Sequence, residues 1–492
     1  MWLEWSADAF ARARTDAKPV LLSITASWCH GCAVMDRVTY ADAAIAETIN
    51  RRFVPVRVDA DRRPDVNERY NLEGWPTTAF LTPSGEMLTG TTYLPPNGLR
   101  ALLEEVATAY ESKREELDLR AGSLTAARRA RIAPSAAPVE PDLAAPQWIA
   151  RRVIDECDVL HGGFGTGGKF LHVAALRVAL DEYARTRDEA LQTALTRTLD
   201  AMAEGQIRDA IDGGFFRYVS SRDWTRPHTE KMLEDQAGLL ELYAEAGRVF
   251  EIADYQDVAR EIMAYVHGTL ASPEPPAFFA SQAADETYYQ VSSAAIRQTL
   301  PPPVVDRTLF TDLTARASAA WLRAGVLLGD RAAAEFGGRA LDRLLTLTYE
   351  PGNGVAHWFD GQSGIRGLLT DQVHAAWALL ALHDATGNPT WSMLAEELMR
   401  TALRTHWDSS QRGFFDRVSD SSEEIGLMAE PLKPLATNCL ASRVLARLSR
   451  LTGKLDLQEK ALDTLRAQTT AYRQQGLFGA PYALAVADVV GS

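Results

Sequence analysis

The spacing of apolar residues changes character twice along the chain. Over residues 1 to about 112, short apolar runs alternate with helical stretches. A connector from 113 to 146 begins as charged helix and becomes rich in alanine and proline, and such a segment buries too little apolar surface to order itself. From 147 to 492 the pattern is helical throughout. We therefore predict an N-terminal domain over 1–112, a linker over 113–146 and a helical domain over 147–492.

The first segment predicts a mixed sheet with helices on its faces. Residues 19–26 and 53–59 are apolar runs of strand length, as expected for strands buried on both sides. Residues 77–82 and 87–93 predict a hairpin, because proline and glycine between them suit a tight turn. Helical spacing occupies the remaining stretches, at 6–14, 30–50, 64–70 and 99–110. Strand, helix, strand, hairpin and helix together indicate an α/β domain.

The helical segment contains a weak repeat. Turns with an aromatic residue recur on average roughly every 60 residues, and this length holds two helices and their loops. These turns are at Gly163-Phe164, Gly214-Phe215, Phe278-Phe279, Trp358-Phe359, Gly413-Phe414 and Leu477-Phe478. Six such hairpins would close into a double-layered ring, so we predict an (α/α)6 toroid. The alternative is an ordinary helical domain with scattered turns.

Composition and charge limit the classes of function. Hydrophobic residues make up 46% and charged residues 24% of the chain, as in globular proteins. The formal net charge of −14 argues against binding to nucleic acid or to an anionic membrane, because both surfaces are negative. Four cysteines are too few to cross-link a secreted fold of this size. The start of the chain has no export signal and no apolar run approaches ~20 residues, so we expect a cytoplasmic protein.

Two of the cysteines carry the most specific chemical signal. The sequence Trp28-Cys29-His30-Gly31-Cys32 follows a predicted buried strand and opens a helix. Backbone N–H groups at a helix start stabilise a thiolate, so we expect Cys29 to attack and Cys32, one turn later, to resolve the mixed disulfide. A cationic His30 would favour the thiolate further. A zinc site needs a second ligand pair, which this segment lacks, and an inert pair is the other alternative.

A second motif supports redox chemistry. Gly74-Trp75-Pro76-Thr77-Thr78 precedes a predicted strand, and the segment resembles thioredoxin-like proteins. In these proteins the proline, here Pro76, faces the cysteine pair and helps to dock the substrate chain. Many of them carry a buried acid on the first core strand, where this chain has Ser23. That difference leaves open how Cys32 is deprotonated.

The resemblance narrows to one family. The stretches LSITASWCHGCAVMDRVTYAD, FVPVRVDADRRPDVNERY and GWPTTAFLTPSGE resemble the N-terminal domain of the spermatogenesis-associated protein 20 family. The resemblance covers most of the chain. It implies a thioredoxin-like domain of unknown function joined to a six-hairpin glycosidase-like toroid.

In the toroid, the block DGGFFRY…DWTRPHTEKMLEDQA resembles that family's most characteristic segment. Its polar and aromatic residues are candidates for a cavity lining, with His228 or Glu230 as acid or base. A glycosidase would pair Glu230 with Asp212 or Asp371, whereas an epimerase would use His228 and His374. The candidate ligand residues are therefore Arg217, Tyr218, Trp224, His228, Glu230, Lys231, Asp371 and His374. The alternative is that these residues only pack and cap helices.

Other parts of the toroid differ from the family pattern. Relatives open one helix with Trp-Asn-Gly, where this chain has Asp312-Leu313-Thr314. Such losses suggest that an ancestral site has been altered. The stretch from Gly163 to Lys169 imitates a phosphate loop, but a helical pattern precedes it and Phe170 replaces the hydroxyl residue, so nucleotide binding is not expected.

The sequence thus favours a thiol–disulfide oxidoreductase acting on protein thiols or disulfides. The site consists of Cys29 and Cys32, supported by Trp28, His30 and Pro76. No cofactor and no metal are expected. One alternative is a carbohydrate-active protein with a small sugar-like ligand in the toroid and a vestigial thioredoxin-like head. The other is a non-catalytic interaction protein.

Overall fold

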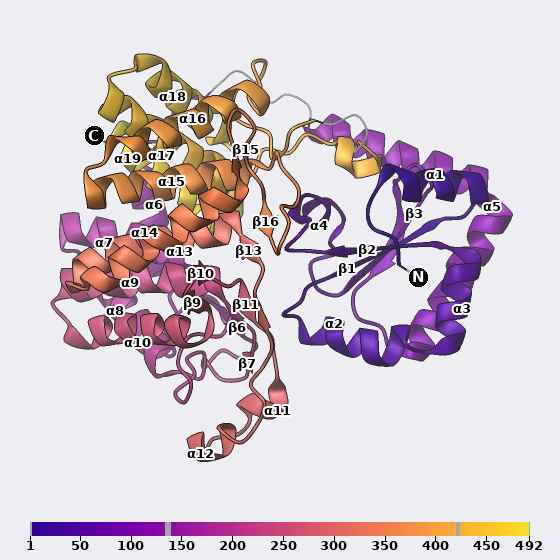
Figure 1. Ribbon diagram of the computed structural model, residues 1–492, viewed down its shortest axis with the longest axis horizontal. Helices are drawn as coiled ribbons and strands as arrows, with labels where there is room; N and C mark the ends of the chain where they lie inside the picture. Colours follow the sequence, from indigo (N-terminus) through magenta and orange to yellow (C-terminus); the bar gives the residue numbers. More distant parts are fainter. Residues whose placement is uncertain (1, 133–138, 420–423, 492) are drawn as a thin grey trace. The chain divides into compact units, whose positions relative to one another are not determined.

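The computed structural model describes residues 2–132, 139–419 and 424–491, which form two units. The thioredoxin-like unit comprises Met1–Ala136 together with Arg417–Leu432, and the toroid unit comprises Ala137–Asp416 and Lys433–Ser492. Both predicted fold classes are present, as Figure 1 shows.

The thioredoxin-like unit is built on a four-stranded mixed sheet with the order β2-β1-β3-β4. The strands are β1 (Val20–Thr25), β2 (Val54–Asp59), β3 (Thr77–Leu81) and β4 (Met87–Thr91). The central strand β1 runs parallel to β2 and antiparallel to β3. Its first five residues are fully buried, as their continuous apolar run predicts.

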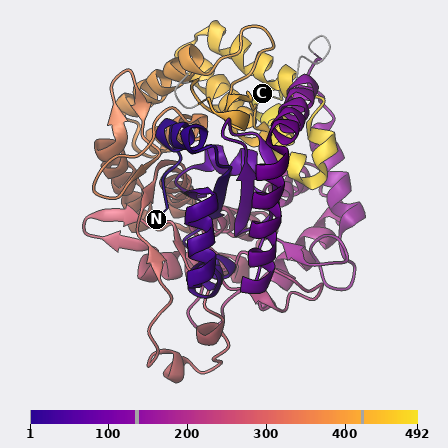
Figure 2. The same ribbon diagram turned by 90° about the vertical axis from the view of Figure 1, so that its right-hand side faces the viewer.

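Helices cover this sheet. They are α1 (Ala7–Asp16), α2 (His30–Val34), the π-helical turn η1 (Met35–Tyr40), α3 (Ala43–Arg52), α4 (Pro64–Tyr70) and α5 (Pro96–Ile132). The helix expected over 30–50 is interrupted, because Asp42 is extended and caps α3 with its side chain. Figure 2 shows α3 and α5 on one face of the sheet, where Ile45, Ile49 and Leu103 pack with Leu21 and Phe80.

The domain boundaries differ from the sequence expectation in two places. Helix α5 is kinked at Lys113, the first residue of the predicted linker, and its second part, to Ile132, is helical as expected but belongs to the thioredoxin-like unit. In addition, residues 417–432, called here the strap, belong to that unit although they lie late in the chain. Their described part includes the 3-10 helix η2 (Gly426–Ala429). The pattern of residues along the sequence does not show that this late segment packs with the N-terminal domain.

Side chains of α4 hold the strap. The hydroxyl of Tyr70 donates to Gly85 O at 2.7 Å and accepts from the backbone N–H of Leu427 at 2.8 Å. The guanidinium of Arg69 donates to the carbonyls of Leu427 at 3.1 Å and Glu430 at 2.7 Å. Because Arg69 and Tyr70 are buried, these bonds satisfy backbone groups that water does not reach.

The toroid unit pairs successive helices. Its inner helices are α7 (Val173–Thr186), α9 (Leu233–Phe250), α13 (Thr311–Leu328), α15 (Leu369–Thr386), α17 (Leu435–Thr452) and α19 (Ala480–Val490). Each contacts the next, and α19 closes on α7, so they form a ring. The outer helices are α6 (Ala145–Glu156), α8 (Glu189–Glu204), α10 (Ala253–Thr269), α14 (Arg331–Thr348), α16 (Pro389–Thr405) and α18 (Leu455–Gln468). This is the predicted (α/α)6 toroid.

Short strands and helices fill the connections between the hairpins. The strands are β5 (Lys169–Phe170), β6 (Tyr218–Val219), β7 (Pro227–His228), β8 (Lys231–Met232), β9 (Ala271–Pro273), β10 (Pro276–Phe278), β11 (Ser281–Gln282), β12 (Val305–Asp306), β13 (Leu309–Phe310), β14 (Tyr349–Glu350), β15 (Gly354–Val355) and β16 (Trp358–Phe359). The remaining short helices are α11 (Glu286–Tyr289), α12 (Ala294–Arg297) and η3 (Tyr472–Gly479).

Burial follows the layer in which a helix lies. The inner helix α15 is buried at nearly every position from Leu369 to Leu382, whereas the outer helix α16 buries one stripe that includes Leu398 and Met399. A helix enclosed on all sides needs apolar residues all round, and an outer helix needs them on one face only.

A recurrent contact, called here the amide clamp, holds some of the Gly-aromatic turns. The fourth residue of an inner helix brackets the backbone of the turn before it with its side-chain amide. Gln236 accepts from Phe215 N and donates to Phe215 O, both at 2.8 Å. Gln372 does the same at Val355, and Asn438 at Phe414. The clamp thus anchors two of the predicted turns, Gly214-Phe215 and Gly413-Phe414, and a further turn at Gly354-Val355.

A buried lysine–aspartate pair stabilises three of the loops. Lys169 pairs with Asp158 at 2.9 Å, Lys231 with Asp209 at 2.8 Å and Lys433 with Asp408 at 2.8 Å. The Lys169 ammonium also donates to Gly165 O at 2.7 Å. Lys169 thus binds its own loop, which agrees with the expectation that this stretch is not a phosphate loop.

None of the described helices is both long and apolar enough to cross a lipid bilayer.

Candidate functional site

The cysteine pair lies where β1 gives way to a helical run. Cys29 is the N-cap of α2 and Cys32 lies in its first turn. The backbone N–H of Cys32 donates to Cys29 Sγ at 3.2 Å. Both thiols are free and both residues are buried, with Cys29 8% and Cys32 3% exposed. The sulfur of Cys29 therefore occupies the position at which helix N–H groups stabilise negative charge.

The two thiols differ in their electrostatic surroundings. The pKa of Cys32 is raised above its ordinary value, first by its hydrogen bond with Cys29, then by burial and by repulsion from Cys29. The carboxylate of Asp36, one turn farther along, raises it slightly more and is itself ion-paired with Arg57. Cys32 is thus held as a thiol that can donate to the Cys29 sulfur.

Aromatic residues and Pro76 surround the pair. The indole N–H of Trp28 donates to Asp61 at 2.8 Å, and its ring meets the ring of Trp75 edge-on at 5.3 Å between centroids. Trp75 precedes Pro76 through a cis peptide bond. A Cβ added to Gly31 would lie 3.2 Å from Pro76 Cδ and 3.9 Å from Cys29 Sγ. The structure therefore brings Pro76 alongside the CxxC turn, while His30 is exposed.

The core strand offers no acid beneath the thiols. Ser23 is fully buried and lies opposite Arg57 on β2 and Thr78 on β3. The hydroxyl of Tyr40 lies 2.8 Å from Thr78 Oγ1, and burial raises the pKa of Tyr40. The polar groups near Ser23 are therefore the hydroxyls of Tyr40 and Thr78 and the guanidinium of Arg57, and none of them is an acid like that of many thioredoxins.

Two of the predicted ligand residues of the toroid have packing roles. Trp224 is 2% exposed, donates to His161 O at 2.8 Å and packs against Gly163. Lys231 is fully buried in its pair with Asp209, and burial lowers its pKa to about 8. Both side chains thus anchor the loop, and Trp224 also lines a surface cavity with His161 and Asp200.

Four other candidates lie together on the β5-β6-β7 sheet and beside it. Tyr218 and His228 are cross-strand partners whose rings stack 4.0 Å apart, and Phe170 stacks on the other face of Tyr218 at 5.1 Å. Arg217 Nη1 lies 3.6 Å from Glu230 Oε1. These candidates therefore comprise stacked aromatic rings and, next to them in the sequence, the ion pair of Arg217 and Glu230. Asp212, a proposed partner of Glu230, is instead ion-paired with Arg297 at 3.0 Å.

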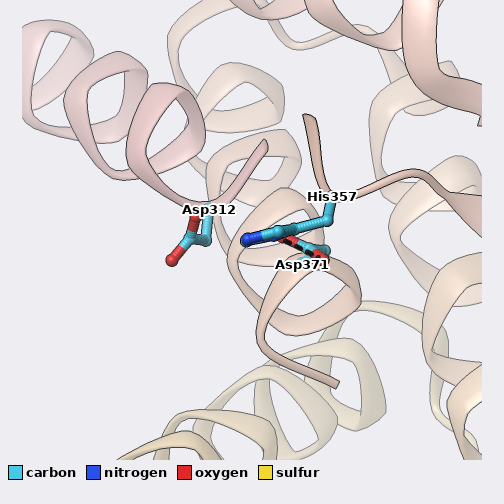
Figure 3. A group of neighbouring side chains, drawn as sticks. All are labelled: Asp312, His357 and Asp371. Atoms are coloured by element: carbon cyan, nitrogen blue, oxygen red, sulfur yellow. Dashed lines mark hydrogen bonds and ion pairs between the residues drawn. The ribbon is translucent and has the colours of Figure 1, made fainter. Parts of the chain in front are cut away.

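Asp371 and His374 occupy the first turns of α15, and both are buried. Asp371 accepts a hydrogen bond from His357 Nδ1, which lies 2.9 and 3.1 Å from its two oxygens. Figure 3 shows that Asp312, at the start of α13, faces the same imidazole. His357 escaped the sequence analysis because it lies 14 residues from Asp371, in a loop next to an aromatic turn. No local motif marks it.

Comparison with known proteins agrees with both halves of the fold. Residues 1–128 match the model of the Thioredox_DsbH family, described as a protein of unknown function, DUF255. A 94-residue stretch, 18% of the chain, is 28% identical to the thiol:disulfide interchange protein DsbD of Campylobacter jejuni, of which it covers 17%.

Solved structures match the toroid at low sequence identity. A D-mannose isomerase aligns with a TM-score of 0.54 at 11% identity, covering 66% of this chain and 85% of that one. Cellobiose 2-epimerase from Bacillus thermoamylovorans aligns with a TM-score of 0.55 at 11% identity, covering 67% and 87%. At such identities the likeness shows the fold alone, and the fold is the one predicted.

Curated relatives of the same family align with more of the chain than the N-terminal domain. Human spermatogenesis-associated protein 20 is 32% identical over 340 residues, which cover 62% of this chain and 43% of that protein. The mouse protein is likewise 32% identical over 337 residues, covering 62% and 42%. The chain spans less than half the length of these curated relatives. Its resemblance to spermatogenesis-associated protein 20, predicted from sequence stretches in the N-terminal domain, is thereby confirmed.

Proposed function

We propose that this chain is a thiol–disulfide oxidoreductase acting on protein thiols or disulfides. The observation that carries the proposal is the hydrogen-bonded pair at the helix start, in which Cys29 Sγ accepts the Cys32 N–H and Cys32 is held as a thiol. Pro76 beside Gly31 supports it, because it offers an edge against which a substrate chain can lie. The cytoplasm is proposed as the place of action, since four cysteines are too few to cross-link a secreted fold of this size.

The reaction transfers two electrons. The Cys29 thiolate attacks one sulfur of a substrate disulfide, whose S–S bond breaks as the Cys29–substrate bond forms and one substrate thiolate leaves. Cys32 then loses its proton to solvent and attacks the Cys29 sulfur. The second substrate thiolate leaves, and Cys29 and Cys32 are oxidised to a disulfide. A small dithiol reductant restores the pair, and the reverse sequence would oxidise a substrate dithiol.

The test is reduction of insulin disulfides by the full chain, with dithiothreitol as the reductant. We expect Cys29→Ser to lower the rate to that of dithiothreitol alone, because no attacking sulfur remains. Cys32→Ser should instead accumulate a mixed disulfide at Cys29, detectable by mass. Cys157→Ser is the matched control, since this half-buried cysteine lies at the end of α6 in the toroid unit. Equal rates for wild type and Cys29→Ser would contradict the proposal.

A second proposal concerns a small carbohydrate-like ligand on the toroid unit. It is supported by the parallel rings of Phe170, Tyr218 and His228, whose planes differ by 11° and 14°. The C–H face of a sugar ring packs well on such a flat aromatic face. Charged neighbours such as Arg217 and Glu230 would bind its hydroxyl groups, and His228 or Glu230 would act as acid or base.

Thermal unfolding of the full chain with a panel of mono- and disaccharides tests this second proposal. We expect at least one saccharide to raise the Tm of wild type and not that of Phe170→Ala, which removes an exposed ring of the stack. Phe478→Ala is the control, because Phe478 is also an exposed phenylalanine but does not contact Tyr218. No shift with any saccharide would contradict the proposal.

A further inference from the structure

We propose that Asp312 and His357 bind a divalent transition-metal ion in the toroid unit, with Asp371 as the carboxylate that orients His357 from its other ring nitrogen. The three residues come from separate segments: the first turn of α13, the residue before β16, and the first turn of α15. One ligand atom from each lies within 4.8 Å of those from the other two. Figure 3 shows their side chains converging.

The donor set fits zinc and its neighbours. One imidazole nitrogen and one carboxylate oxygen are ligands that Zn²⁺, Co²⁺ and Mn²⁺ accept, and the remaining coordination positions are left to water or to a further side chain. With metal–ligand bonds of about 2.0–2.2 Å, tetrahedral ligands lie roughly 3.3–3.6 Å apart. The ligand atoms of the observed cluster lie within 4.8 Å of one another.

The orientation of His357 is fixed by Asp371. Its Nδ1 lies 2.9 Å from Asp371 Oδ1, and Figure 3 shows the other ring nitrogen directed towards Asp312. When Nδ1–H donates to a carboxylate, Nε2 carries the lone pair. An electron-rich nitrogen and the Asp312 carboxylate then face one region, and a cation there would stabilise both. Metal-bound histidines are usually oriented by such a carboxylate.

The burial of this cluster and its negative charge also favour a bound cation. His357 and Asp371 are 2% and 0% exposed. Bringing two carboxylates together in a buried site is unfavourable without positive charge, which a divalent ion would supply.

Backbone contacts hold the ligands in place before any ion binds. The hydroxyl of Thr311 donates to Ala356 O at 2.5 Å, and the Thr311 N–H donates to His357 O at 2.8 Å. Leu309 and Phe310 on β13 also pair with Phe359 and Trp358 on β16. The loop that carries His357 is thus bound to the start of the helix that carries Asp312, as a pre-organised site requires.

An independent observation is His374, one turn after Asp371 on the same face of α15. It is nine-tenths buried and makes no hydrogen bond or ion pair with any residue in the described part of the chain. Burial and the nearby Arg316 place its pKa well below the ordinary value, so the imidazole is neutral. An imidazole nitrogen that meets no protein partner remains available to a ligand or to water. It would serve as a further metal ligand or contact a metal-bound water.

Titration of the full chain with Co²⁺, followed by visible absorption, tests the proposal, with Zn²⁺ competition as a second readout. The background is Cys29→Ser/Cys32→Ser, because a thiol pair binds these ions itself. The variants are Asp312→Asn and His357→Gln. Asp188→Asn is the matched control, since Asp188 also lies at a helix start but in the outer layer, where it caps α8.

We expect one equivalent of Co²⁺ to bind in the background chain and in the Asp188→Asn control. Affinity should fall tenfold or more in Asp312→Asn and His357→Gln. Absence of stoichiometric binding, or unchanged affinity in Asp312→Asn, would overturn the proposal and leave a purely structural Asp–His pair. Asp312 is the less buried ligand, so its variant decides the question if His357→Gln fails to fold. The outcome does not depend on the thiol reaction.

Discussion

His406 is a buried histidine with a partner at each ring nitrogen. Its Nε2 lies 3.1 Å from Gly367 O, and its Nδ1 lies 2.8 Å from the hydroxyl of Thr405, which also donates to Thr401 O at 2.8 Å. A carbonyl can only accept, so Nε2 carries a proton. Burial lowers its pKa to about 4, although Gly367 O and Asp416 favour the charged form.

The lowered pKa of His406 predicts that the folded protein loses stability in mild acid. The unfolded chain takes up a proton at His406 below about pH 6.5, whereas the folded chain does so only near pH 4. Stability therefore falls as the pH drops through this window, by about 2 kcal/mol between pH 7 and pH 5 from this group. Urea unfolding at the two pH values measures the effect. His406→Gln should flatten the pH dependence and His383→Gln should not, and equal slopes in both would contradict the assignment.

Individual residues show what the sequence can and cannot predict. Cys29 and Cys32 were identified correctly as neighbours at a helix start, because their spacing is local. Lys231 looked like a ligand residue only because it is charged and lies in a loop. Its partner Asp209 is 22 residues earlier, and local patterns do not reveal such a pair. His357 was missed for the same reason.

At the scale of elements, periodicity predicted the helices well and their functional contacts poorly. The spacing of Gly-aromatic turns is visible in the sequence. The amide clamp is not, because Gln236, Gln372 and Asn438 lie far from one another and look like ordinary polar residues near helix starts. At Phe215, Val355 and Phe414 the clamp pairs a buried backbone N–H and C=O that need partners.

The contact between α4 and the strap predicts that these two segments stabilise each other. Tyr70→Phe removes the hydroxyl that binds Leu427 N–H and Gly85 O, which leaves two buried backbone groups without a partner. We expect a cost of about 1–3 kcal/mol. Hydrogen exchange resolved to peptides should show faster exchange in α4 and in the strap.

Tyr93→Phe is the matched control for this change, because Tyr93 is 42% exposed and its hydroxyl has access to water. Its exchange pattern should equal that of wild type. If Tyr70→Phe also leaves the protection of α4 unchanged, the strap contributes no stability to the thioredoxin-like unit.

At the scale of the whole molecule, composition and repeats predicted two units and both fold classes. The boundaries were harder, because a boundary depends on which surfaces pack together. Helix α5 continues past the predicted end of the first domain to Ile132, and the chain returns to the same unit at Arg417. A pattern read along the chain treats domains as continuous, and this one is not.

The strap also sets an order of events during synthesis. It leaves the ribosome about 280 residues after the end of α5, which corresponds to about 15–60 s at typical elongation rates. During that interval Arg69 and Tyr70 have no strap carbonyls or N–H groups to bind. The N-terminal unit is therefore the first to begin folding but cannot finish until most of the toroid has been made.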